Sequence, residues 1–129
     1  MAGLGLFGFL RRFRILLNRR RFKRVRVPFL LRYTVEEIGV QGITNLHDLS
    51  VGGVLFTAEE GVPKGARVRL EIALPKREQP IITFARVVRV SRVPHWGLYR
   101  VATEFENLKV SDRKEIRRLV ERFALGKLK

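Results

Sequence analysis

The chain has 129 residues, 46% of them apolar, which is the size and composition of one globular domain. It has no cysteine, which excludes disulfides and thiolate metal sites, and its two histidines argue against a buried transition-metal centre. The formal net charge of +15 favours an anionic partner, such as nucleic acid, anionic lipid or a phosphorylated small molecule.

The positive charge is concentrated near the N-terminus. The segment from Arg11 to Arg26 holds nine Lys or Arg residues and no acidic residue. Within Met1–Leu17 the apolar residues fall on one helical face, and the longest apolar run, of ten residues, is too short to cross a bilayer. We therefore expect a basic amphipathic helical extension over residues 1–18. It would pack on the domain or on a second subunit, or lie peripherally on an anionic membrane.

From Pro28 onward the pattern predicts short strands separated by Gly and Pro turns. The clearest is Ala66–Leu74, where Val68, Leu70, Ile72 and Leu74 alternate with charged residues, as in a half-buried antiparallel strand. The other predicted strands are Phe29–Glu37, Gly42–Leu49, Val54–Ala58, Ile81–Val93 and a last one ending at Phe105.

A helix is predicted to follow the strands. Ser111 or Asp112 can cap it, Gly126 can end it, and its apolar stripe consists of Ile116, Leu119, Val120 and Phe123. The predicted fold is mainly β: a small six-stranded antiparallel β-barrel, occupying residues 19–129 together with this C-terminal α-helix.

An enzyme is not expected. His47, Asp48 and Ser50 stand close in sequence, but strict strand alternation places His47 on the face opposite Asp48. The chain shows no metal-ligand spacing, P-loop or dinucleotide fingerprint, so we expect neither a catalytic site nor a cofactor.

A ligand-binding group is easier to assemble from the same stretch, Asp48-Leu49-Ser50-Val51-Gly52-Gly53. Alternation gives Asp48 and Ser50 one outward face, and the two glycines allow a tight turn or a close backbone approach. A carboxylate accepts from the paired donors of a guanine Watson–Crick edge, and an arginine fork fits guanine O6 and N7 or a phosphate. The arginines of RRRFKR lie about thirty residues upstream.

Arg20-xxx-Arg24, preceded by Arg19 and followed by Asp48-x-Ser50-x-x-Gly53, resembles the PilZ domain, the bacterial receptor module for cyclic di-GMP. Each short motif is weak alone, but their order and spacing on a six-strand pattern are fairly specific, and the resemblance extends to about Phe123. It implies a cyclic di-GMP site made of the following residues: Arg19, Arg20, Arg24, Asp48, Ser50, Gly52 and Gly53.

The resemblance implies that the arginines bind guanine and phosphate and that Asp48 and Ser50 bind a guanine edge. It also implies that the arginine segment becomes ordered when it closes over the ligand. The resemblance also implies a cytoplasmic adaptor for a downstream protein partner not yet identified. The extension is not part of the shared domain, so peripheral contact with the inner membrane through Met1–Leu17 is an expectation from its amphipathic pattern alone. The domain is predicted not to bind nucleic acid, because the basic charge sits in a tail and not along a groove.

Other interpretations stay open at this point. The arginines can be a solvated basic linker, and Asp48 and Ser50 can simply organise the turn through side-chain to backbone bonds. The barrel can also lack the ligand and serve as a nucleic-acid-binding or membrane-surface module. For Trp96 and Tyr99, a place in the core or at the barrel rim is favoured over base stacking.

Overall fold

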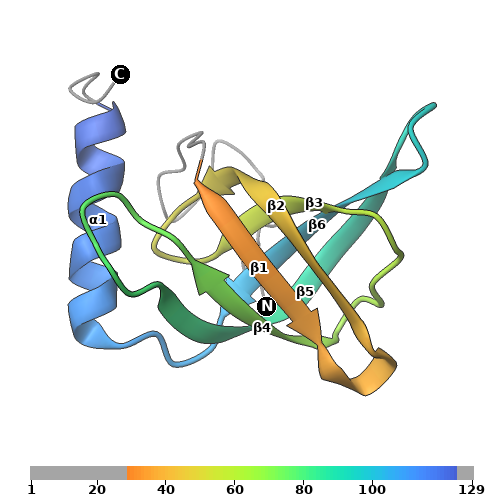
Figure 1. The fold of residues 1–129 in the computed structure, drawn as a ribbon, viewed down its shortest axis with the longest axis horizontal. Coiled ribbons are helices and arrows are strands. Elements are labelled where there is room, and N and C mark those ends of the chain that lie inside the picture. Colours follow the sequence, from red (N-terminus) through yellow and green to blue (C-terminus); the bar gives the residue numbers. More distant parts are fainter. Residues whose placement is uncertain (1–28, 125–129) are drawn as a thin grey trace.

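The computed structural model describes residues 29–124 as a barrel of six strands with a C-terminal helix (Figure 1). The predictions for the N-terminal extension, for Arg19, Arg20 and Arg24, and for Gly126 lie outside these residues. In chain order the elements are β1 (Leu30–Val35), the 3₁₀ turn η2 (Glu36–Ile38), β2 (Val40–Leu49), β3 (Val54–Ala58), β4 (Arg67–Ile72), β5 (Ile81–Val93), β6 (Leu98–Phe105) and α1 (Val110–Ala124).

The strands form one closed antiparallel barrel in the order β1-β2-β3-β6-β5-β4, which confirms the predicted fold class. Closure is made by β1 and β4, where Leu31 lies opposite Ile72 and Tyr33 opposite Leu70. Each of the six strands therefore has a partner on both sides, and the barrel presents no open edge. Among residues 29–124 no helix is long and apolar enough to cross a membrane.

The barrel interior is filled by the alternate apolar residues of each strand. In β4 the predicted inward residues Val68, Leu70 and Ile72 are all buried, whereas Arg67, Arg69 and Glu71 face outward. The largest fully buried side chain is Phe56 of β3, whose ring centroid lies 4.8 Å from that of Tyr33 in β1. Close packing of this kind makes the inward or outward direction of every strand residue matter for stability.

Helix α1 covers one end of the barrel and lies beside the β4–β5 connection (Figure 1). Its apolar stripe is as predicted, because Ile116, Leu119 and Val120 belong to the same buried cluster as the barrel interior. Phe123 packs at the edge of this cluster, with its ring perpendicular to that of Phe29 at a centroid distance of 5.9 Å.

The prediction for the start of this helix was wrong. The helix begins at Val110, so Ser111 and Asp112 lie in its first turn and neither is the capping residue. Asp112 is buried and accepts a hydrogen bond from Arg77 at 3.3 Å, and Glu115 accepts from the same guanidinium. The acidic pair therefore ties the β4–β5 connection to the helix.

The β5–β6 hairpin extends beyond the barrel (Figure 1). Its tip turns through His95 and Gly97, whose φ angles are +69° and +65°. Tyr99 packs against the core, as predicted, but the same prediction was wrong for Trp96, which is 73% exposed at the tip. The turn lifts Trp96 away from the apolar interior.

Replacing Phe56 by alanine should lower the free energy of unfolding by about 3–5 kcal/mol, because the change leaves a large cavity in a closed barrel. Ile43→Ala is the control, since Ile43 is 63% exposed on β2 and its loss should change stability by less than about 0.5 kcal/mol. Urea unfolding followed by circular dichroism measures both. Equal effects of the two substitutions would contradict the placement of Phe56 in the core.

Candidate functional site

A β-bulge in β2 decides which way Asp48 faces. Leu46 lies opposite Phe56 of β3 and Asp48 opposite Leu55, so His47 is an extra residue in β2. As a result Leu46 and Leu49 are both buried, whereas His47 and Asp48 are both partly exposed. The sequence argument that His47 and Asp48 occupy opposite faces was therefore wrong, because it assumed strict alternation through the bulge.

Ser50 does not share the outward face of Asp48. It is only 3% exposed, and its Oγ accepts hydrogen bonds from the N–H groups of Gly52 and Gly53 at 3.1 and 3.2 Å. The same hydroxyl donates to the carbonyl of Gly53. The expectation that Ser50 points outward was wrong, and the alternative, that it organises the turn into the glycine pair, describes its contacts.

Only glycine fits at position 53, because strand β6 lies directly against its backbone. A Cβ at this position would stand 1.9 Å from the carbonyl oxygen of Thr103 in β6, so no other residue fits without a backbone shift. The Thr103 hydroxyl donates to the carbonyl of Val54 at 2.9 Å and accepts from its N–H at 3.3 Å. The carbonyl of Gly52 accepts from the N–H of Phe105 at 2.8 Å. The turn after Asp48 is thus held against β6.

A row of four residues crosses the outer surface of the barrel from Asp48. Asp48 lies opposite Leu55, Leu55 opposite Ala102, and Ala102 opposite Arg89, so the row runs over β2, β3, β6 and β5. We call these four residues the outer row. A second bulge, between Val87 and Arg89, brings Arg89 onto this surface. With strands about 4.8 Å apart, the row spans about 14 Å.

The centre of the outer row is apolar and its ends are charged. Leu55 and Ala102 are 8% and 3% exposed, yet neither belongs to the core cluster inside the barrel. Arg89 ends the row, and desolvation lowers the pKa of its guanidinium from the ordinary value. The row thus has a carboxylate at one end, a cation at the other and two apolar residues between them that expose almost no area, so a ligand here would be held chiefly through the two charged ends.

The sequence analysis did not find Leu55, Ala102 and Arg89. No local motif marks them, because they reach Asp48 only through the register between strands and through the second bulge. Among residues 29–124 there is no group of three or more His, Asp or Glu side chains that could hold a metal ion.

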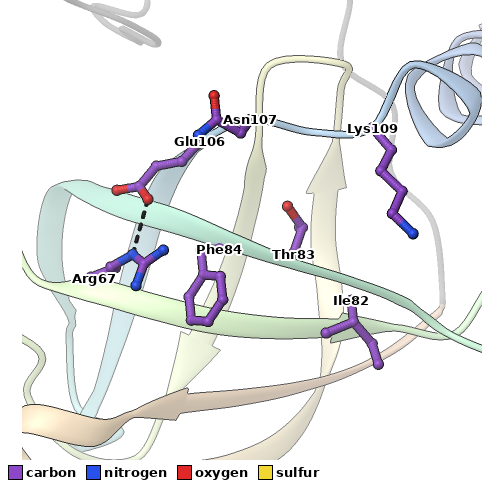
Figure 2. A pocket seen from close by; sticks show the side chains of 7 residues that line it. All are labelled: Arg67, Ile82, Thr83, Phe84, Glu106, Asn107 and Lys109. Carbon is purple, nitrogen blue, oxygen red and sulfur yellow. Dashed lines mark hydrogen bonds and ion pairs between the residues drawn. The ribbon is translucent and has the colours of Figure 1, made fainter.

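A shallow hollow of about 160 Å³ lies elsewhere on the barrel, between β4, β5 and the segment that leads into α1 (Figure 2). Its arginine, Arg67, stacks over the ring of Phe84 at 3.8 Å and is paired with Glu106 at 3.0 Å. Glu106 also pairs with Arg86. The hollow contains no residue of the outer row and no residue of the Asp48–Gly53 motif, so it is distinct from the candidate site.

Comparison with known proteins identifies the family and the fold. A family model described as "PilZ domain" matches residues 18–122. A solved structure of the Bacillus subtilis inhibitor of motility (MotI/DgrA) aligns with a TM-score of 0.73 and 24% identity, covering 88% of this chain and 55% of that one. Escherichia coli YcgR in complex with c-di-GMP aligns with a TM-score of 0.68 and 22% identity, covering 86% and 50%.

The isolated PilZ domain of Escherichia coli YcgR with c-di-GMP aligns with a TM-score of 0.61 and 20% identity, covering 85% of this chain and 97% of that one. This chain therefore spans about half the length of the two larger structures and nearly all of the isolated domain. At these identities the structural likeness shows the fold. No curated protein matches the chain.

Replacing Gly53 by alanine should lower the free energy of unfolding by about 3 kcal/mol or more, because the new methyl group overlaps the Thr103 carbonyl and backbone must move. Gly61→Ala is the matched control. Its Cβ would meet Tyr99 at 3.7 Å, an ordinary contact, so it should cost little. Thermal and urea unfolding measure both variants, and a fully stable Gly53→Ala protein would refute the close approach of the turn to β6.

Proposed function

We propose that this chain, which belongs to the PilZ domain family, is a non-enzymatic receptor for cyclic di-GMP. The proposal rests on the position of Asp48. Its side chain faces outward at one end of the outer row, and the turn that Ser50 and Gly53 hold in place follows it in the chain. Both YcgR structures that align with this chain are complexes with c-di-GMP.

Asp48 is the residue we expect to recognise the base. A guanine Watson–Crick edge presents two adjacent N–H donors, and a carboxylate can accept both. The apolar surface of Leu55 next to Asp48 lowers the local dielectric, which strengthens such charged hydrogen bonds. Specificity for guanine then follows, because a base without these donors leaves the carboxylate unpaired.

Ser50, Gly52 and Gly53 contribute by fixing the turn that follows Asp48. The three bonds of the Ser50 hydroxyl and the contact of Gly53 with β6 hold the backbone of this turn in one conformation. A ligand approaching the turn therefore meets a preorganised surface and does not have to order it, which saves binding free energy. Their part in the site is to set the geometry around Asp48.

Arg19, Arg20 and Arg24 are proposed to bind phosphate and the second guanine edge. Their planar forks suit both kinds of acceptor pair, and an anionic ligand relieves the repulsion among the nine basic residues from Arg11 to Arg26. Binding would reposition this N-terminal segment on the barrel, and a downstream protein would recognise the new arrangement. Contact of Met1–Leu17 with anionic lipid stays a separate prediction.

Isothermal titration of the full chain with cyclic di-GMP tests the receptor function, with the linear GMP dinucleotide as the control ligand. We expect saturable binding that is selective for the cyclic form. Asp48→Ala should weaken it at least tenfold, because one hydrogen-bonded charge contributes about 1.5–3 kcal/mol.

The matched control is Glu37→Ala, which removes an exposed acid from the η2 turn and should leave the affinity unchanged. If a folded protein binds no cyclic di-GMP, the receptor function is rejected, and the barrel without ligand becomes the explanation. If Asp48→Ala and Glu37→Ala both bind cyclic di-GMP as tightly as the unsubstituted chain, the protein is a receptor for this ligand but Asp48 is not part of the binding site.

A further inference from the structure

Arg100 of β6 lies on the same outer surface as Asp48, although no motif marks it. Its neighbour Val101 is fully buried in the core, so the side chain of Arg100 faces away from the barrel interior. It precedes Ala102 of the outer row by two positions along β6 and therefore shares its face. Arg100 lies opposite Thr57 of β3 on one side and opposite Ser91 of β5 on the other.

The guanidinium of Arg100 has an unused donor. Its Nε is buried, and among residues 29–124 it finds no hydrogen-bond partner. A buried N–H without a partner has lost its hydration without compensation, so native proteins rarely keep one without a reason. Other arginines of the barrel surface show the contrast: Arg67 and Arg86 both pair with Glu106, and Arg77 pairs with Asp112.

The surroundings of Arg100 are suited to a bound anion or a base edge. The adjacent residues of the outer row, Leu55 and Ala102, are apolar and almost fully covered, which weakens competition from water. Thr57 and Ser91, the residues opposite Arg100 on β3 and β5, carry hydroxyl groups and no charge. Glu104 is an acid on the same face of β6. It stands opposite Arg86 of β5, whose guanidinium is ion-paired with Glu106.

We propose that Arg100 is a further ligand-binding residue of this site and that its planar fork binds an adjacent pair of acceptors on the ligand. Such pairs are offered by guanine O6 and N7 and by a phosphate group. The inference rests on the proposed receptor function and extends the site from Asp48 and the N-terminal arginines onto β6. The site then has a hydrogen-bond acceptor on β2, the carboxylate of Asp48, and a hydrogen-bond donor on β6, the guanidinium of Arg100, two strands away.

Titration of three full-length variants with cyclic di-GMP tests this proposal. Arg100→Ala should weaken binding at least tenfold, and Arg100→Lys, which keeps the charge but loses the planar fork, should recover little of it. Arg92→Ala is the matched control. It removes the same charge from the same hairpin, but Arg92 lies opposite Tyr99, whose side chain packs toward the core, and so belongs to the other face. Its affinity should stay within twofold of the unsubstituted chain.

Stability of the ligand-free protein separates binding from a structural role. If Arg100 serves the ligand, Arg100→Ala should leave the unfolding midpoint without ligand unchanged or higher, because a partnerless buried donor is removed. It should also lose most of the rise in midpoint that the ligand produces. A residue with a structural role would instead lower the midpoint of the ligand-free protein.

The outcomes are distinct. No binding by the unsubstituted chain contradicts the proposed function and this inference with it. Binding that Arg100→Ala and Arg92→Ala leave equally strong contradicts the inference alone. Cyclic di-AMP as a second ligand identifies the acceptor pair. If Arg100→Ala reduces the ratio of the two affinities, the pair is on the guanine edge; if the ratio is unchanged while both affinities fall, the pair is on phosphate.

Discussion

The structure depends on the contact between the β2–β3 turn and β6. Glycine alone fits at position 53, because a Cβ there would overlap the carbonyl oxygen of Thr103, and the hydroxyl of Thr103 in turn bonds both backbone groups of Val54. These partners are about fifty residues apart in the chain, so the contact joins segments that no local pattern connects. It fixes the register of β3 against β6 and, through β3, the place of Asp48 beside them.

Two β-bulges explain why both ends of the outer row are charged although the barrel interior is apolar. Strict alternation after the inward residues Leu46 and Val87 would turn Asp48 and Arg89 inward. An ionised side chain in that interior would be costly unless it were paired. Each bulge inserts one residue and turns the next one outward, which is the usual use of bulges beside functional sites. Leu55 and Ala102, which lie between Asp48 and Arg89 in the outer row, are apolar and almost fully buried, so little water reaches the middle of the row.

Charge is divided between the barrel and the segment before it. Several cations of the barrel are paired with acids, as Arg67 and Arg86 are with Glu106, so they add little to long-range attraction. The segment from Arg11 to Arg26 contains no acid. In the proposed function this segment attracts an anionic ligand, whereas the carboxylate of Asp48 selects its base, so affinity and specificity come from different parts of the chain.

Sequence alone determined the strands, their turns and the helix stripe, because those features repeat over a few residues, as in Val68, Leu70 and Ile72 of β4. It also located the neighbourhood of the site, since Asp48 and Gly53 belong to one short motif. Only the tertiary structure decided that the Ser50 hydroxyl turns inward and that Arg100 faces outward beside the row that begins at Asp48. The reason is that bulges and strand register are set by hydrogen bonds between distant segments, and these leave no periodic signal in the sequence.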